Sequence, residues 1–117
     1  MSTTASSHTP SATAKNVAST TITHQVPNNA LVTCVEIALG QAKTVSTVTI
    51  GGTSASSLAV SNLGGVRYET WYLANPGSGA KAVVVTPTAS CDMVVSATSL
   101  VPSAQSGIYL TGVAPSL

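Results

Sequence analysis

The sequence of 117 residues predicts an all-β domain, a two-sheet sandwich of about eight short strands preceded by an extended N-terminal arm. From Thr20 onward, short runs rich in Val, Ile, Thr and Tyr alternate with Gly, Pro and Asn, as strands alternate with turns. No 3.6-residue apolar period is sustained, so helices are not expected. Many short strands at regular spacing in so few residues indicate a two-sheet sandwich or a small barrel.

Residues 1–19 differ in composition from the rest of the chain. About half of them are Ser or Thr, and they show no hydrophobic period. Such a segment buries too little apolar surface to offset the entropy lost when it becomes ordered. We therefore expect an extended Ser/Thr-rich arm over residues 1–19, held in place only by another chain, and a sandwich domain over residues 20–117.

Eight strands are predicted within this domain, with ends set by the Gly, Pro and Asn residues. Along the second strand, Leu31, Val35, Ile37 and Leu39 form one apolar face, while Glu36 lies on the opposite face. The predicted strands cover residues 20–26, 31–39, 45–50, 57–60, 66–73, 81–86, 93–100 and 108–111.

The small number of charges limits the classes of partner. Charged residues make up 6% of the chain, and the formal net charge is +1. Nucleic acids and anionic membranes require clustered Lys and Arg, so we expect neither as a partner. Globular domains carry about a quarter charged residues, so a surface this neutral predicts contact with other proteins or an extracellular position. Near-zero net charge also favours self-association.

The sequence contains no membrane-spanning or secretory pattern. No apolar run reaches the length of about 18 residues that a membrane helix needs, and the first residues lack a basic region followed by an apolar one. We therefore expect synthesis in the cytosol without a Sec-type signal.

Residues 66–76 hold the single Trp and the only close Arg/Glu pair. Arg67, Glu69 and Trp71 alternate along a strand and therefore share one face. One interpretation is a polar and aromatic surface patch that binds a sugar. In the other, which is the commoner arrangement, Trp71 anchors the core and the two charges cap the edge of the sheet.

The two cysteines, Cys34 and Cys91, are expected to be free thiols. Cys34 has the strand parity of Glu36, opposite the apolar face, whereas Cys91 has the parity of the core residues Met93 and Val95. A disulfide requires Cβ atoms within about 4.5 Å, which side chains on opposite faces do not reach.

Catalytic and metal-binding patterns are missing from the sequence. His8 lies in the arm and His24 in the first strand, neither with a second ligand at metal-site spacing. Glycoside hydrolysis requires two facing carboxylates, for which Glu36 and Asp92 on neighbouring strands are the available pair. We expect a protein that is not an enzyme, and we assign no catalytic, cofactor-binding or metal-binding residue and no cofactor.

Three segments resemble a known family. Residues 47–52 (TVTIGG), 65–76 (GVRYETWYLANP) and 82–86 (AVVVT) are similar to the immunoglobulin-like β-sandwich repeat of bacterial surface proteins and phage structural proteins. The resemblance implies an immunoglobulin-like or jelly-roll-like sandwich, and a scaffold of this kind does not specify a ligand. The usual strands after Leu100 are replaced by a short tail, so at least one sheet edge is expected to be open.

The outline of the chain, a short sandwich with a polar arm, resembles the decoration or cement proteins of phage capsids. This resemblance implies a virion structural protein, a homo-oligomer that stabilises a phage shell by contacts with the major capsid protein or other virion subunits. Its location would be the virion, after assembly in the host cytoplasm. The alternative is an immunoglobulin-like adhesion or carbohydrate-binding module of a phage fibre or a bacterial surface protein.

Overall fold

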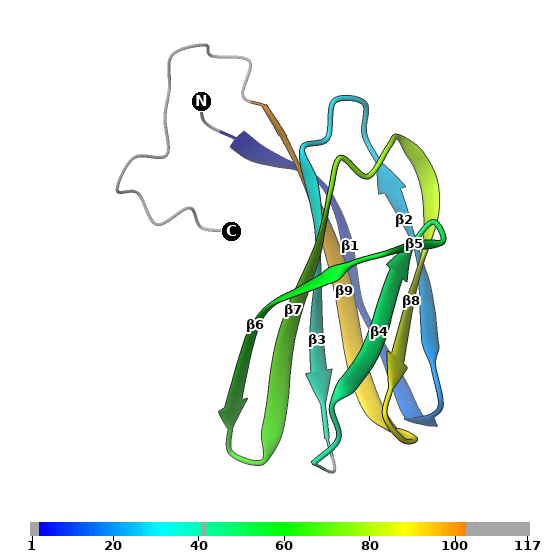
Figure 1. Ribbon diagram of the computed structural model, residues 1–117, viewed down its shortest axis with the longest axis vertical. Coiled ribbons are helices and arrows are strands. Elements are labelled where there is room, and N and C mark those ends of the chain that lie inside the picture. Colours follow the sequence, from blue (N-terminus) through cyan, green and yellow to red (C-terminus); the bar gives the residue numbers. More distant parts are fainter. Residues whose placement is uncertain (1–2, 41, 103–117) are drawn as a thin grey trace.

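The computed structural model describes residues 3–40 and 42–102, apart from the side chains of residues 3–6 and 10–12, and this part of the chain is all-β (Figure 1). The described residues form nine strands and no helix, so none of them offers a helical membrane span. The strands are β1 (Thr3–Val17), β2 (Thr20–Val26), β3 (Val32–Leu39), β4 (Val45–Ile50), β5 (Thr53–Ser54), β6 (Ser56–Leu63), β7 (Val66–Ala74), β8 (Gly79–Pro87) and β9 (Cys91–Pro102).

The strands form two antiparallel sheets that pack against each other, which confirms the predicted all-β sandwich. One sheet has five strands in the order β1-β9-β3-β7-β6, and the other has four in the order β2-β8-β4-β5. The predicted strands 20–26 and 45–50 coincide with β2 and β4. The strand predicted at 57–60 is longer, because β6 begins at Ser56 and ends at Leu63. The strand predicted at 108–111 lies outside the described residues.

The N-terminal segment is the main difference from the sequence prediction. Residues Thr3–Val17 pair along β9 of the same chain, from Thr3 opposite Pro102 to Val17 opposite Cys91. This pairing corrects the expectation that only another chain holds the arm. Apolar burial is not the only interaction that orders an edge strand, because backbone hydrogen bonds also hold it, and Ser and Thr form these as well as apolar residues do.

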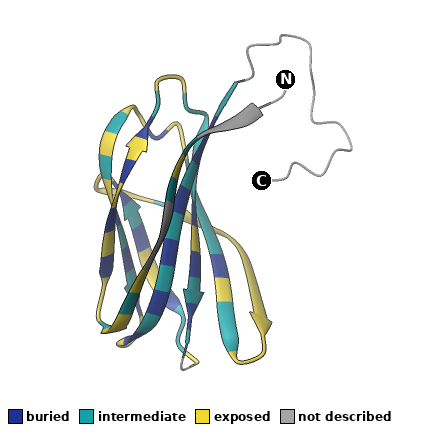
Figure 2. Cartoon of the chain, turned by 180° about the vertical axis from the view of Figure 1, so that it is seen from behind, coloured by how far each residue is buried: buried dark blue, intermediate teal, exposed yellow. Residues whose placement is uncertain are grey.

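The core lies between the two sheets and follows strand alternation, apart from β4, where a register shift between Val45 and Thr47 interrupts it. On β3, Val35, Ile37 and Leu39 are buried and Glu36 is exposed, as predicted. Figure 2 shows buried residues alternating with more exposed ones along the strands. Most of the core side chains are β-branched, which suits a pleated surface. The central cluster consists of Ile22, Val35, Ile37, Leu39, Val45, Val48, Ile50, Val83, Val85, Cys91, Met93, Val95 and Ala97.

A buried histidine links the two sheets at the side where β1 leads into β2. His24 on β2 is fully buried, and both of its ring nitrogens are hydrogen bonded to hydroxyl groups of the five-stranded sheet. Its Nδ1 lies 2.6 Å from Thr9 Oγ1 on β1, and its Nε2 lies 2.7 Å from Ser99 Oγ on β9. Ser99 Oγ in turn lies 2.7 Å from Thr33 Oγ1 on β3. Since each hydroxyl can donate or accept, a neutral imidazole is fully satisfied.

This histidine predicts a loss of stability in mild acid. Burial, and secondarily the charge of nearby His8, lower the pKa of His24 below its usual 6.5. Below pH 6.5 the unfolded chain binds a proton that the folded chain excludes, so the free energy of unfolding should fall as the pH decreases toward the folded pKa. The expected slope reaches about 1.4 kcal/mol per pH unit, measured by urea denaturation between about pH 7.5 and pH 5.

Two variants assign the effect to its residue. His24→Gln should flatten the pH dependence in this window, whereas His8→Gln, at an exposed position, should keep most of it. A wild-type protein that is as stable at pH 5 as at pH 7.5 would contradict the prediction.

Candidate functional site

The three residues predicted to share a face on β7 do so, and that face points inward. Glu69 is only 4% exposed, and it accepts hydrogen bonds from three donors. Its Oε2 accepts from Arg67 Nε at 2.8 Å and from the backbone N–H of Val45 at 2.9 Å, and its Oε1 accepts from Trp71 Nε1 at 2.9 Å. Val45 belongs to β4, so this carboxylate joins the two sheets.

The surroundings of Glu69 keep it charged. Burial acts to raise the pKa of Glu69, but the hydrogen bonds from Arg67, Val45 and Trp71, together with the charge of Arg67, hold its pKa below the usual value. Trp71 is partly buried and packs against the core cluster. The interpretation that Trp71 anchors the core therefore fits the geometry, and the carboxylate acts as a structural acceptor rather than as a proton carrier.

We predict that Glu69→Gln destabilises the fold by roughly 2–4 kcal/mol, because it removes the charge that compensates Arg67 and replaces one acceptor oxygen with a donor. Glu36→Gln is the matched control, since it removes the same charge from an exposed position and should cost less than about 0.5 kcal/mol. Denaturant unfolding at neutral pH measures both changes.

The difference between wild type and Glu69→Gln should also depend on pH. A lowered carboxyl pKa contributes stability above the unfolded value of 4.5, and this contribution disappears as the pH falls through the folded pKa. Equal stability of the two proteins at neutral pH would show that the carboxylate does not hold the sheets together.

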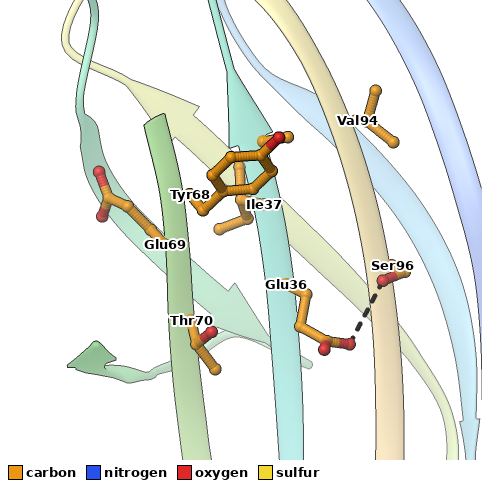
Figure 3. A pocket seen from close by; sticks show the side chains of 8 residues that line it. Glu36, Ile37, Tyr68, Glu69, Thr70, Val94 and Ser96 are labelled. Atoms are coloured by element: carbon orange, nitrogen blue, oxygen red, sulfur yellow. Dashed lines mark hydrogen bonds between the residues drawn. The ribbon is translucent and has the colours of Figure 1, made fainter. Parts of the chain in front are cut away.

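The opposite face of the same strand carries a shallow hollow with a volume of about 250 Å³. Glu36 on β3 lies between Thr70 on β7 and Ser96 on β9, and Ser96 Oγ donates a weak hydrogen bond of 3.5 Å to Glu36 Oε1. Figure 3 shows Glu36, Thr70 and Ser96 together at this surface, with the ring of Tyr68 above them, while Glu69 points the other way. Sequence reasoning missed this surface, although the alternate positions of the same strand could have indicated it.

The carboxylate pair considered for acid-base chemistry does not form. Glu36 faces Ser96, whereas Asp92 lies four positions earlier on β9, where its Oδ1 accepts a 2.8 Å hydrogen bond from the backbone N–H of Asn16. Among the described residues, no three His, Cys, Asp or Glu side chains gather in a way that could hold a metal ion.

The cysteines lie in the two environments predicted from strand parity. Cys34 is half-buried on the outer face of β3, opposite Tyr72 and Thr98, while Cys91 is buried in the core, and both are free thiols. Burial raises the pKa of each thiol, and a neighbouring carboxylate raises it further. A protonated thiol is a poor nucleophile, so neither cysteine suits covalent catalysis.

A different surface stands out on β6. All eight residues of this strand are exposed, and none of them is charged. Leu58, Val60 and Leu63 are 57%, 45% and 72% exposed, and neighbouring Tyr68 is 43% exposed. These four are all the large apolar side chains that the described part of the chain exposes. We call the strand Ser56–Leu63 with these side chains the β6 edge.

Comparison with known proteins finds no matching family model, no matching curated protein and no matching solved structure. The geometry of the β6 edge, of the outer hollow and of the two inter-sheet links therefore carries the functional argument.

Proposed function

We propose that this chain is a virion structural protein, a capsid decoration or cement protein that binds and stabilises a phage shell by protein-protein contacts. The observation that carries the proposal is the β6 edge, an uncharged strand that bears three of the four exposed large apolar side chains of the described residues, with the fourth, Tyr68, on neighbouring β7. Apolar patches on a small domain mark contact sites for other proteins. The partners would be the major capsid protein, other virion subunits and further copies of this chain.

The neutral surface supports the same proposal. With a formal net charge of +1 and few charges of either sign, long-range repulsion does little to keep copies apart. Two buried titratable groups, His24 and Glu69, are engaged in links between the sheets, which favours a scaffold over an enzyme. Two free thiols suit assembly in the host cytoplasm before release in the virion.

Reconstitution with a shell tests this function. A phage major capsid protein from the same source as this chain is expressed and assembled into shells, purified protein is added, and the particles are sedimented. We expect saturable binding at a fixed ratio of copies to shell subunits and a higher thermal transition of the shell. Binding should persist in about 1 M salt, since apolar contacts are not screened. Failure to sediment with the shell at saturating protein would contradict the proposal.

Carbohydrate binding is the second candidate function, and the outer hollow is the observation that favours it. An exposed tyrosine ring beside a carboxylate and two hydroxyl groups offers a flat apolar surface with polar acceptors and donors. When glycans are added to the protein, the NMR signals of residues around Glu36 and Tyr68 should then shift. Tyr68→Ala should abolish these shifts. If no NMR signal of the wild-type chain changes on addition of glycans, carbohydrate binding is excluded as the function.

A further inference from the structure

We infer that the β6 edge is the surface through which this chain associates with itself, by antiparallel pairing of β6 with β6 of a second copy. A two-fold axis between the strands would join two five-stranded sheets into one continuous sheet. The pairing names the surface by which copies of the proposed decoration protein associate, and its biological role rests on that proposed function.

The outer edge of β6 is unprotected in the described part of the chain. Among the described residues, β6 pairs only with β7, so the backbone groups along its outer side have no strand partner. Natural proteins protect such edges with Lys, Pro, bulges or a covering segment. The eight residues of β6 include no proline and no charged residue. The one register shift between β6 and β7 lies near the start of β6, between Ser57 and Ala59.

The other sheet edges are protected by comparison. β1, at the far edge of the same sheet, carries Pro10 and Lys15 and has three register shifts. It packs beside β2, where Ser7 Oγ donates to the carbonyl of Gln25. The edge of the four-stranded sheet opposite β2 is formed by β5, which has only two residues and is therefore a short edge. The β6 edge is therefore the long open edge of the described sandwich.

β6 also exposes three large apolar side chains, Leu58, Val60 and Leu63. Strand alternation directs neighbouring side chains to opposite faces of the sheet, and every residue of β6 is exposed, so neither face is covered by the four-stranded sheet. In Figure 1, β6 stands at the outer side of the sandwich beside β7, away from β2 and β8. A second β6 strand would cover Leu58, Val60 and Leu63 together with the backbone groups.

A second copy fits this surface better than an unrelated strand. An uncharged strand meets itself without repulsion, and antiparallel pairing continues the arrangement of every strand pair in the structure. Eight residues at about 3.4 Å each, with about 5 Å of side chain on each face (half the spacing of packed sheets), give roughly 270 Å² per copy. The total of roughly 500 Å² lies below the size of stable specific interfaces, so the pairing should be weak and reversible.

Sedimentation of the full chain over about 1 μM to 1 mM tests the pairing. The expected mass rises from 11.6 kDa toward twice that value. Over the same range, hydrogen exchange at the amides of residues 56–63 should slow, while exchange in β2 stays unchanged. A single species of 11.6 kDa at 1 mM, or a dimer whose β6 exchange does not slow, would overturn the inference.

Charged variants give a matched comparison. Leu58→Lys with Val60→Lys places two charges on the β6 edge and should weaken dimerisation at least about tenfold. Thr21→Lys with Thr23→Lys adds the same charge at exposed positions of β2 and should change it less than about twofold. Circular dichroism and thermal unfolding are used to check that each variant folds. If a variant does not fold, the hydrogen exchange of residues 56–63 in the wild-type protein tests the pairing instead. Equal weakening by both pairs of substitutions would overturn the inference.

Three further outcomes distinguish the possible occupants of the β6 edge and separate the two proposals. If deletion of residues 103–117 produces a dimer where the full chain is monomeric, those residues occupy the β6 edge and the inference is wrong. A protein that stays monomeric yet sediments with the shell overturns β6 pairing and leaves the proposed function standing. A dimer that forms through β6 but does not bind the shell supports the pairing and overturns the decoration role.

Discussion

The buried carboxylate of Glu69 is the constraint on which the arrangement of the sandwich depends. It accepts hydrogen bonds from Arg67 and Trp71 on its own strand and from the backbone of Val45 in the other sheet. Without this acceptor, the N–H of Val45 and the Nε1–H of Trp71 would lose their partner in the sandwich interior, where an unsatisfied group costs about 1–3 kcal/mol. Arg67, whose side chain is 26% exposed, would lose its counter-charge but could still reach water. His24 has the matching role at the other side of the sandwich, where its ring connects β2 with β1 and β9. Apolar residues of the core fill the space between these two polar links.

The direction of Glu69 also decides which residues form the outer surfaces. Because Arg67, Glu69 and Trp71 point inward, strand alternation turns Tyr68 and Thr70 outward, where they meet Glu36 across the sheet. The link to Val45 holds β4 over β7 and not over β6. The four-stranded sheet then stops short of the last strand, which leaves the β6 edge uncovered. The positions of the candidate contact surfaces thus follow from how the buried polar groups of the interior are hydrogen bonded.

Much of this fold could be predicted from the sequence, because strand alternation is a local signal. The inward positions of Val35, Ile37 and Leu39, the shared face of Arg67, Glu69 and Trp71, and the opposite placement of the two cysteines all follow from parity. The pairing of β1 with β9 does not, because the paired residues lie 74 (Val17 and Cys91) to 99 (Thr3 and Pro102) positions apart in the chain. For the same reason the hydrogen bonds of His24 could not be predicted, and neither could the separation of Glu36 from Asp92, which depends on the register between β3 and β9.

An open apolar edge on a nearly uncharged protein is a liability unless something limits where the edge can bind. Edge strands of low charge without Pro pair with other exposed strands, and unlimited pairing leads to aggregation. In the described part of the chain the opposite edge of the five-stranded sheet packs beside β2, so these residues present one such edge and not two. A molecule with a single adhesive edge forms a closed pair instead of a growing fibre, since a two-fold contact uses the same surface on both partners. The asymmetry between β1 and β6 is therefore the feature that makes an exposed edge compatible with a defined assembly.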